Sequence, residues 1–172
     1  MSGHADLNIR TFVPGDLAQV HELFARGLME FAGGVELEVR SYVDHSLSDD
    51  LADIPRHYLS HLRANFWVVE SSDLGIVGIV GIQPRELEEE AELRRMSVSS
   101  SVRRQGIGRR LLETTEDFCR EKGYRRIRLS TVAILKPALS LYQGYGYTTV
   151  KEEPYGDPPH RPITVHHLVK EL

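Results

Sequence analysis

The sequence predicts a mixed α/β fold, built as one domain over residues 1–172, and three observations support this prediction. Apolar residues recur at helical spacing over 17–31 and 108–122, whereas short apolar stretches such as 75–82 are typical of strands. A strand, a loop, a helix and another strand follow one another over 91–131, and such a crossover makes its two strands parallel. The chain of 172 residues is long enough to enclose a core.

Each element is expected from its local pattern. The expected helices have apolar residues three and four positions apart, and they cover 17–31, 36–47, 51–64, 108–122 and 137–143. The expected strands are short and apolar or alternating, and they cover 8–12, 66–70, 75–82, 91–98, 126–131, 147–151 and 163–169. The turn at 71–73 joins two of these strands into an antiparallel hairpin, and residues 86–90 are expected to be a solvated acidic loop.

Composition excludes several classes of protein. Hydrophobic residues make up 41% and charged residues 27% of the chain, values typical of a folded globular protein. The formal net charge of -4 offers no general attraction for nucleic acid, so we expect no such partner. No stretch approaches the roughly 20 apolar residues that span a bilayer, so no membrane contact is expected. The single Cys119 allows no internal disulfide, which favours a reducing, cytoplasmic location and leaves a nuclear one open.

The loop 103–108, Arg-Arg-Gln-Gly-Ile-Gly, is the strongest candidate for a binding site. The first turn of a helix leaves backbone N–H groups unpaired, and glycines such as Gly106 and Gly108 let an anion approach them closely. Arg103, Arg104 and Arg109 add positive charge. The alternative is a plain tight turn with solvated arginines. The loop fits neither a Walker motif nor G-x-G-x-x-G, because Leu111 stands where the third glycine would be.

Two segments together resemble the GNAT superfamily of N-acetyltransferases. That family's pattern for binding acetyl-CoA is Q/R-x-x-G-x-G/A, and Arg103, Gly106 and Gly108 occupy its fixed positions. About thirty residues further on, residues 138–147 read ALSLYQGYGY and resemble the family segment A-x-x-L-Y-x-x-x-G-F/Y. The sequence around residues 96–98 and 135–143 is most similar to the Camello-like branch. That branch usually carries an N-terminal hydrophobic segment, whereas residues 1–8 here are polar, so its location and substrates are not carried over.

The resemblance implies a fold and a cofactor site. It implies a mostly antiparallel sheet of six or seven strands with helices on both faces, in which the central parallel pair 91–98 and 127–131 splays apart to admit the pantetheine arm of acetyl-CoA. It also implies that acetyl passes from the thioester directly to an amine. The cofactor-binding residues that it implies come from one strand and from the loop: Met96, Ser97, Val98, Arg103, Arg104, Gln105, Gly106, Ile107, Gly108 and Arg109.

Such a transfer needs a base for the amine proton, a donor for the thioester oxygen and an acid for the leaving thiolate. Glu92, where several family members place a glutamate, is the candidate base, and the alternative is that it extends the acidic loop. Tyr142 is the candidate acid, and the alternative is a core aromatic, because it shares helical spacing with Ala138 and Tyr145. The backbone N–H of Val98 or of a neighbour would stabilise the oxyanion.

Several points stay open at this stage. Leu135 replaces an asparagine that in many family members contacts the cofactor arm. His57 and His61 share a helix face, but no third or fourth ligand accompanies them, so we expect no metal. The final strand is expected to be exposed, which would permit a homodimer through edge pairing. The acceptor is a primary amine of a small molecule, an amino acid, or a protein N-terminus or lysine. The competing interpretation is a module that binds acyl-CoA without catalysis.

Overall fold

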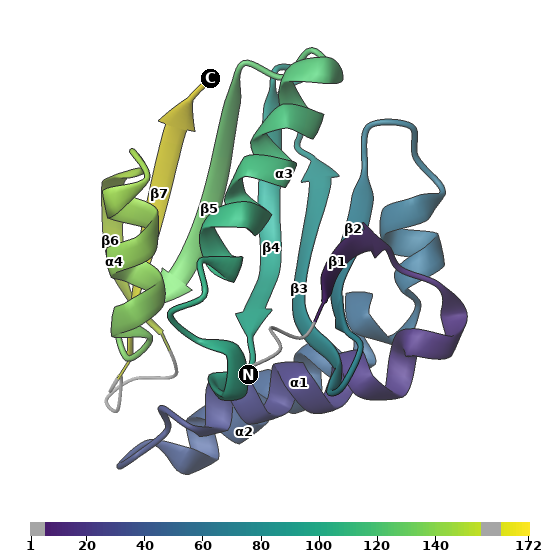
Figure 1. Cartoon of the computed structure of the whole chain (residues 1–172). Coiled ribbons are helices and arrows are strands. Elements are labelled where there is room, and N and C mark those ends of the chain that lie inside the picture. Colours follow the sequence, from purple (N-terminus) through teal and green to yellow (C-terminus); the bar gives the residue numbers. More distant parts are fainter. Residues whose placement is uncertain (1–5, 156–162) are drawn as a thin grey trace.

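The structure, a computed structural model, describes residues 6–155 and 163–172 (Figure 1). Within this part of the chain, seven strands form one sheet in the order β1-β2-β3-β4-β5-β7-β6. The strands are β1 (Leu7–Thr11), β2 (Asn65–Ser71), β3 (Gly75–Pro84), β4 (Glu90–Val98), β5 (Arg126–Val132), β6 (Thr148–Tyr155) and β7 (Ile163–Glu171). The α-helices are α1 (Leu17–Met29), α2 (Glu36–Ser48), α3 (Ile107–Glu121) and α4 (Lys136–Gly144).

The central pair of strands is the feature that positions the site. β4 and β5 are the parallel neighbours that the crossover through α3 predicts, and every other pairing in the sheet is antiparallel. Their pairing covers only Glu90–Glu92 against Arg126–Arg128. Beyond this point the two strands diverge, and their ends lie well apart in Figure 1. The predicted mixed, mostly antiparallel sheet with a splayed parallel pair is therefore confirmed.

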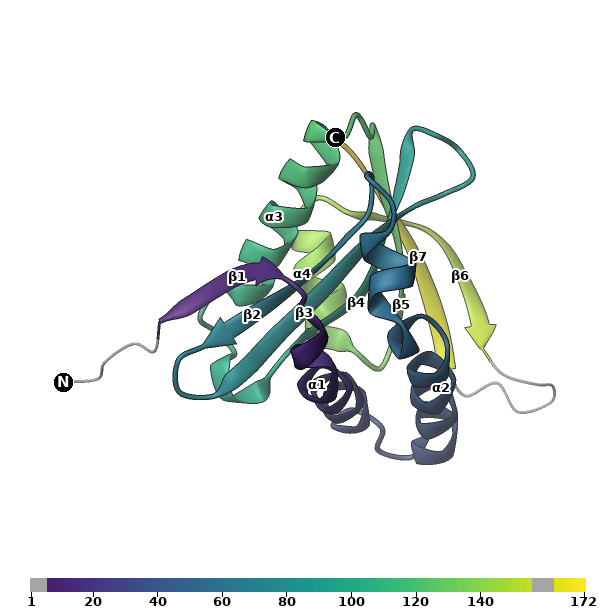
Figure 2. The same ribbon diagram turned by 90° about the vertical axis from the view of Figure 1, so that its right-hand side faces the viewer.

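Helices cover both faces of the sheet (Figure 2). Helices α3 and α4 pack on one face through Leu111, Leu112 and Tyr142, which share a buried cluster with Leu129 of β5. We call this the α3 face. Helices α1 and α2 pack on the other, the α1 face, through a second buried cluster that includes Phe24, Leu28, Val39, Val68 and Ile79. None of the helices in the described ranges is long and apolar enough to cross a bilayer.

Three expectations from the sequence are wrong. Residues 51–64 do not form one helix, since the chain makes only a 3₁₀ turn at Asp50–Ala52 and a π-helical turn at Pro55–Leu59. Pro55 removes a backbone donor and clashes with the preceding turn. The last strand, β7, is not exposed at an edge, because it lies between β5 and β6, so a dimer cannot form through its edge.

The third correction concerns the acidic loop. Glu90 is not solvated there but belongs to β4, where it is 3% exposed. Its carboxylate accepts hydrogen bonds from Arg128 at 2.9 Å and Arg126 at 3.2 Å. Burial alone would raise the pKa of Glu90, but these hydrogen bonds outweigh it and hold the pKa below its usual value. A charged Glu90 therefore joins β4 to β5 just before the two strands diverge.

Candidate active site

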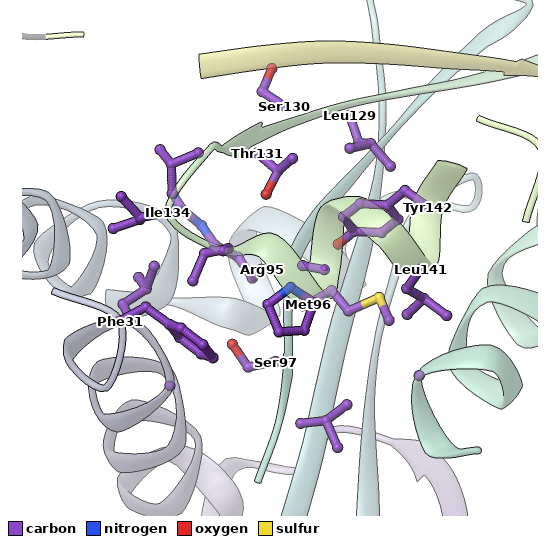
Figure 3. Close-up of a pocket in the computed structure, with 18 of the residues that line it drawn as sticks. Phe31, Arg95, Met96, Ser97, Leu129, Ser130, Thr131, Ile134, Leu141 and Tyr142 are labelled. Atoms are coloured by element: carbon purple, nitrogen blue, oxygen red, sulfur yellow. The ribbon is translucent and has the colours of Figure 1, made fainter. Parts of the chain in front are cut away.

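A pocket of about 620 Å³ occupies the gap between β4 and β5 (Figure 3). Its lining comes from both faces of the sheet. On the α3 face it includes the loop before α3 and residues of α4, and on the α1 face it includes residues of α1 and α2. The pocket therefore passes through the sheet where the parallel pair splays, and two molecules can meet there from opposite sides.

The loop before α3 presents its backbone amides to this pocket. The N–H of Arg110 is bonded to the carbonyl of Gly106, so the amides of Ile107, Gly108 and Arg109 precede the first helical hydrogen bond of α3. Arg104 and Gly106 both adopt left-handed backbone conformations, with φ of 64° and 73°. Such turns gather successive N–H groups into a concave anion-binding surface. Their position at a helix N-terminus adds the positive end of the helix dipole.

The two glycines of this loop are required for different reasons. A Cβ on Gly106 would meet no atom within 4 Å, so its φ of 73° is what favours glycine there. A Cβ on Gly108 would meet Cδ2 of Leu141 at 2.7 Å and Cε of Met96 at 3.4 Å. The sequence argument attributed both glycines to close approach of an anion, but Gly108 is required first by the packing of α4 against α3.

The arginines of the loop are largely engaged with carboxylates. Arg103 donates to Glu30 at 2.7 Å, and its guanidinium carbon lies 5.2 Å from the ring centre of Phe31. Arg109 pairs with Glu113 at 3.1 Å, one turn along α3. Arg104 makes no ion pair with any described residue. The loop therefore presents its backbone amides and Arg104 to an anion, whereas Arg103 and Arg109 are engaged with carboxylates.

The edge of β4 supplies further backbone groups. Arg95 has a φ of 59°, and the register with β3 shifts opposite it, which marks a β-bulge. Past the bulge, Ser99 donates to Val77 of β3 at 2.8 Å. Because successive backbone groups alternate in direction along a strand, the amide of Val98 points away from β3, into the gap, and Met96 lies in the bulge beside it. Ser97 also lines the pocket, with its side chain toward Gly27 of α1.

Tyr142 of α4 lies in the pocket wall with 5% of its surface exposed. Figure 3 shows its hydroxyl directed into the pocket, and Leu141 beside it. Its ring packs edge-on against Tyr147 at 5.9 Å between centres. Burial raises the pKa of the Tyr142 phenol, so the group stays protonated, which is the state that a proton donor needs. Leu135 lines the same pocket as an apolar residue.

Glu92 is placed differently from the other candidate residues. It lies where β4 is still paired with β5, opposite Arg128. Its neighbours Ala91 and Leu93 belong to the cluster on the α3 face, so Glu92 points to the α1 face. Its carboxylate is 3.6 Å from Arg85, and it is not among the described residues that line the pocket. The structure thus brings Tyr142, Met96 and Gly108 together and leaves Glu92 outside the group.

The sequence argument missed three polar residues that line the pocket on the α1 face: Ser130 of β5, His167 of β7 and Glu153 of β6. It also missed that Arg95, directed inward by the bulge, forms an ion pair with buried Asp50 and donates to Tyr42 at 3.0 Å. Both groups depend on strand pairing and tertiary packing, which local sequence patterns do not show.

Comparison with known proteins decides the family. The profile described as "Acetyltransferase (GNAT) family" matches residues 32–147, two thirds of the chain. The chain belongs to this family. It is 39% identical over 110 residues to human N-acetyltransferase 8, a match that covers 62% of this chain and 48% of that protein. It is 36% identical over 115 residues to a probable N-acetyltransferase camello of Xenopus laevis, covering 66% and 52%. The chain thus spans about half the length of the curated relatives it matches.

Solved structures share the fold of this GNAT chain. A GNAT acetyltransferase from Staphylococcus aureus superposes with a TM-score of 0.78 at 21% identity, covering 96% of this chain and 99% of that one. The PaiA N-acetyltransferase of Thermoplasma acidophilum, solved in complex with coenzyme A, superposes with a TM-score of 0.76 at 20% identity, covering 97% and 99%. At these identities the likeness concerns the fold alone.

Proposed function

We propose that this GNAT chain transfers an acetyl group from acetyl-CoA directly to a primary amine. The observation that carries the proposal is the set of amides of Ile107, Gly108 and Arg109 beside a pocket that crosses the sheet between β4 and β5. This arrangement suits a long cofactor with a diphosphate at one end and a reactive group at the other. The coenzyme A bound to the Thermoplasma acidophilum protein of the same fold supports the choice of cofactor.

The proposed reaction assigns a role to each group. The pantetheine arm pairs with the backbone groups of Met96 and Val98, as a neighbouring strand would. The amine nitrogen forms a bond to the thioester carbon, and the developing oxyanion is stabilised by the N–H of Val98. The C–S bond then breaks, and Tyr142 donates its proton to the departing thiolate. We retain Glu92 as a candidate base that acts through water, because its side chain lies on the α1 face near the fork, the point where β4 and β5 separate.

A second candidate function is binding of acyl-CoA without catalysis. The place of Glu92 outside the pocket favours it, since a carboxylate base next to the amine would then be lacking. The amine acceptor also stays a proposal, whether it is a small molecule, an amino acid or a protein amine. The cytoplasmic location and a homodimer are likewise proposals.

Calorimetry and a thiol-release assay test the proposal. We expect saturable heat with coenzyme A, and release of free thiol from acetyl-CoA in the presence of one or more of phenethylamine, spermidine, lysine and peptides with a free N-terminus. Tyr142→Phe should lower kcat by about 10²-fold and leave the affinity for coenzyme A unchanged. Binding without thiol release from any amine would favour the second function, and absence of binding heat would refute both.

A further inference from the structure

Three polar side chains form a hydrogen-bonded chain across the α1 face of β5, β7 and β6. The hydroxyl oxygen of Ser130 lies 2.8 Å from Nδ1 of His167, and Nε2 of the same ring lies 2.7 Å from a carboxylate oxygen of Glu153. All three residues line the pocket. Both ring nitrogens of His167 are thus held, one by a hydroxyl and the other by a carboxylate.

The strand register places this chain at the fork of the sheet. Ser130 pairs directly with His167, so both point to the same face. Ser130 follows two residues after Arg128, the last residue of β5 that pairs with β4, and so has the same orientation as Arg128. Ser130 is therefore the first residue of β5 on this face beyond the point where the strands separate.

The two halves of the pocket differ in character. The amides before α3 and the hydroxyl of Tyr142 lie on the α3 face, where the proposed cofactor binds. The half on the α1 face has an aromatic wall formed by Phe24, Phe31 and Tyr42. Its other wall contains Ser130, His167 and Glu153, and Glu153 is the acidic residue among the described pocket residues. An acceptor with an apolar body and a protonated amine matches this second half.

We propose that His167 takes the proton of the acceptor amine, with Ser130 passing it on and Glu153 holding the ring; this inference rests on the proposed function. The ammonium gives a proton to the oxygen of Ser130 while the hydroxyl proton of Ser130 moves to Nδ1 of His167. The products are a neutral amine and an imidazolium whose Nε2–H donates to Glu153. The neutral amine then attacks the thioester. As the tetrahedral intermediate collapses, its nitrogen loses a second proton, which replaces the one that Tyr142 gives to the departing thiolate, and the imidazolium returns its own proton to solvent.

Some of the charges around His167 stabilise its imidazolium and others destabilise it. Hydrogen bonds from Lys151 and then from His167 hold the pKa of Glu153 below its usual value, so its carboxylate is charged and stabilises the imidazolium. Lys151, 2.7 Å from Glu153, opposes that effect. Arg128 and Arg85 line a small groove beside His167 and also oppose it. Glu153 is accordingly the residue on which a charged His167 depends.

The neighbouring strand positions provide a matched control. His166 lies 3.3 Å from Glu152 on the opposite face of the same two strands and does not line the pocket. His166→Gln and Glu152→Gln therefore remove a histidine–carboxylate pair of similar chemistry from the same strands. If the His167 pair served only to hold β6 against β7, both sets of substitutions would have similar effects.

The test measures kcat/KM for phenethylamine between about pH 5.5 and about pH 9, where a histidine base is lost by protonation. We expect His167→Gln to lower kcat/KM by about 10²-fold near neutral pH and to abolish the fall in rate toward low pH. Glu153→Gln should cause a smaller loss of kcat/KM and shift that fall toward lower pH, because the imidazolium loses the carboxylate that stabilises it. His166→Gln and Glu152→Gln should retain the wild-type profile.

The affinity for coenzyme A, measured by calorimetry, separates failure of this inference from failure of the proposed function. No binding heat with the wild type would refute the function and the inference together. Wild-type affinity in His167→Gln with an unchanged pH profile would overturn the inference alone. Three other results would also overturn it: loss of the acid limb in Glu92→Gln instead, equal losses in the His166 and His167 variants, or binding of coenzyme A with no acetylation of phenethylamine.

Discussion

Replacing Gly108 by alanine tests whether the contact between α3 and α4 determines the shape of the phosphate loop. The new Cβ would lie 2.7 Å from Cδ2 of Leu141 and 3.4 Å from Cε of Met96. The first distance is well inside ordinary van der Waals contact, so Leu141 must move. Because the contacted atom is the end of a flexible side chain, rotation of Leu141 can relieve part of the clash.

The expected magnitude follows from two opposing effects. Overpacking of this kind costs about 1–3 kcal/mol, whereas alanine in place of glycine in a helix gains about 0.5–1 kcal/mol. We therefore expect Gly108→Ala to lower the free energy of unfolding by about 1–2 kcal/mol. For a chain of this length, that loss corresponds to a decrease in Tm of about 2–8 °C.

A double-mutant cycle in urea identifies the cause. Leu141→Ala removes the contacted atom, so the combination with Gly108→Ala should recover at least about 1 kcal/mol relative to the sum of the single effects. The affinity for coenzyme A should recover with it. Gly106→Ala is the control, because its Cβ meets no neighbour and Leu141→Ala should not rescue it. Additive effects of Gly108→Ala and Leu141→Ala would refute the reasoning.

Three further substitutions test other parts of the structure. Gly106→Ala should cost about 1–2 kcal/mol in urea denaturation, because φ is 73°, and Gly106→Asn should cost less, since asparagine tolerates this conformation; equal costs would argue against backbone strain. Glu30→Gln should release Arg103 and tighten binding of coenzyme A by about 2- to 5-fold in calorimetry at low salt, an effect absent from the double variant with Arg103→Ala. Glu90→Gln should lower the free energy of unfolding by about 1–3 kcal/mol at pH 7. The pKa of Glu90 is lower in the folded state than in the unfolded state, so its stabilisation is present above the unfolded-state pKa and is lost as pH falls through the folded-state pKa. The difference in free energy of unfolding between Glu90→Gln and the wild type should therefore disappear in acid. A difference that does not change with pH would contradict a stabilising role for the charged carboxylate.

Local signals predicted the elements whose structure is set locally. The spacing of Ile107, Leu111 and Cys119 places one buried face on α3, and Gly123, with a φ of 81°, follows its end. The same spacing rule failed over 51–64. Leu51, Ile54 and Tyr58 are buried there, as the spacing suggests, but Asp50 is also buried and accepts the hydroxyl of Tyr58. Asp50 also pairs with Arg95 of β4, a tertiary contact that residue spacing does not show.

The same distinction applies to the candidate site. The loop 103–108 is contiguous, so its glycines and their place before a helix could be recognised in the sequence. Ser130 and His167 are 37 residues apart and Glu153 is 14 residues from His167. Their meeting depends on β7 lying between β5 and β6, an order that differs from the order along the chain. A shift of one residue in that register would turn His167 to the other face of the sheet.

The fork between β4 and β5 links stability to the proposed chemistry. Glu90, with Arg126 and Arg128, holds the two strands together at one end, and the bulge at Arg95 interrupts the regular course of β4 at the other. The pocket between these points is open to both faces, so a cofactor bound on the α3 face would form the floor of the half on the α1 face. An acceptor that binds first would lack that floor and would bury less apolar surface. In the proposed reaction, acetyl-CoA should therefore bind before the amine.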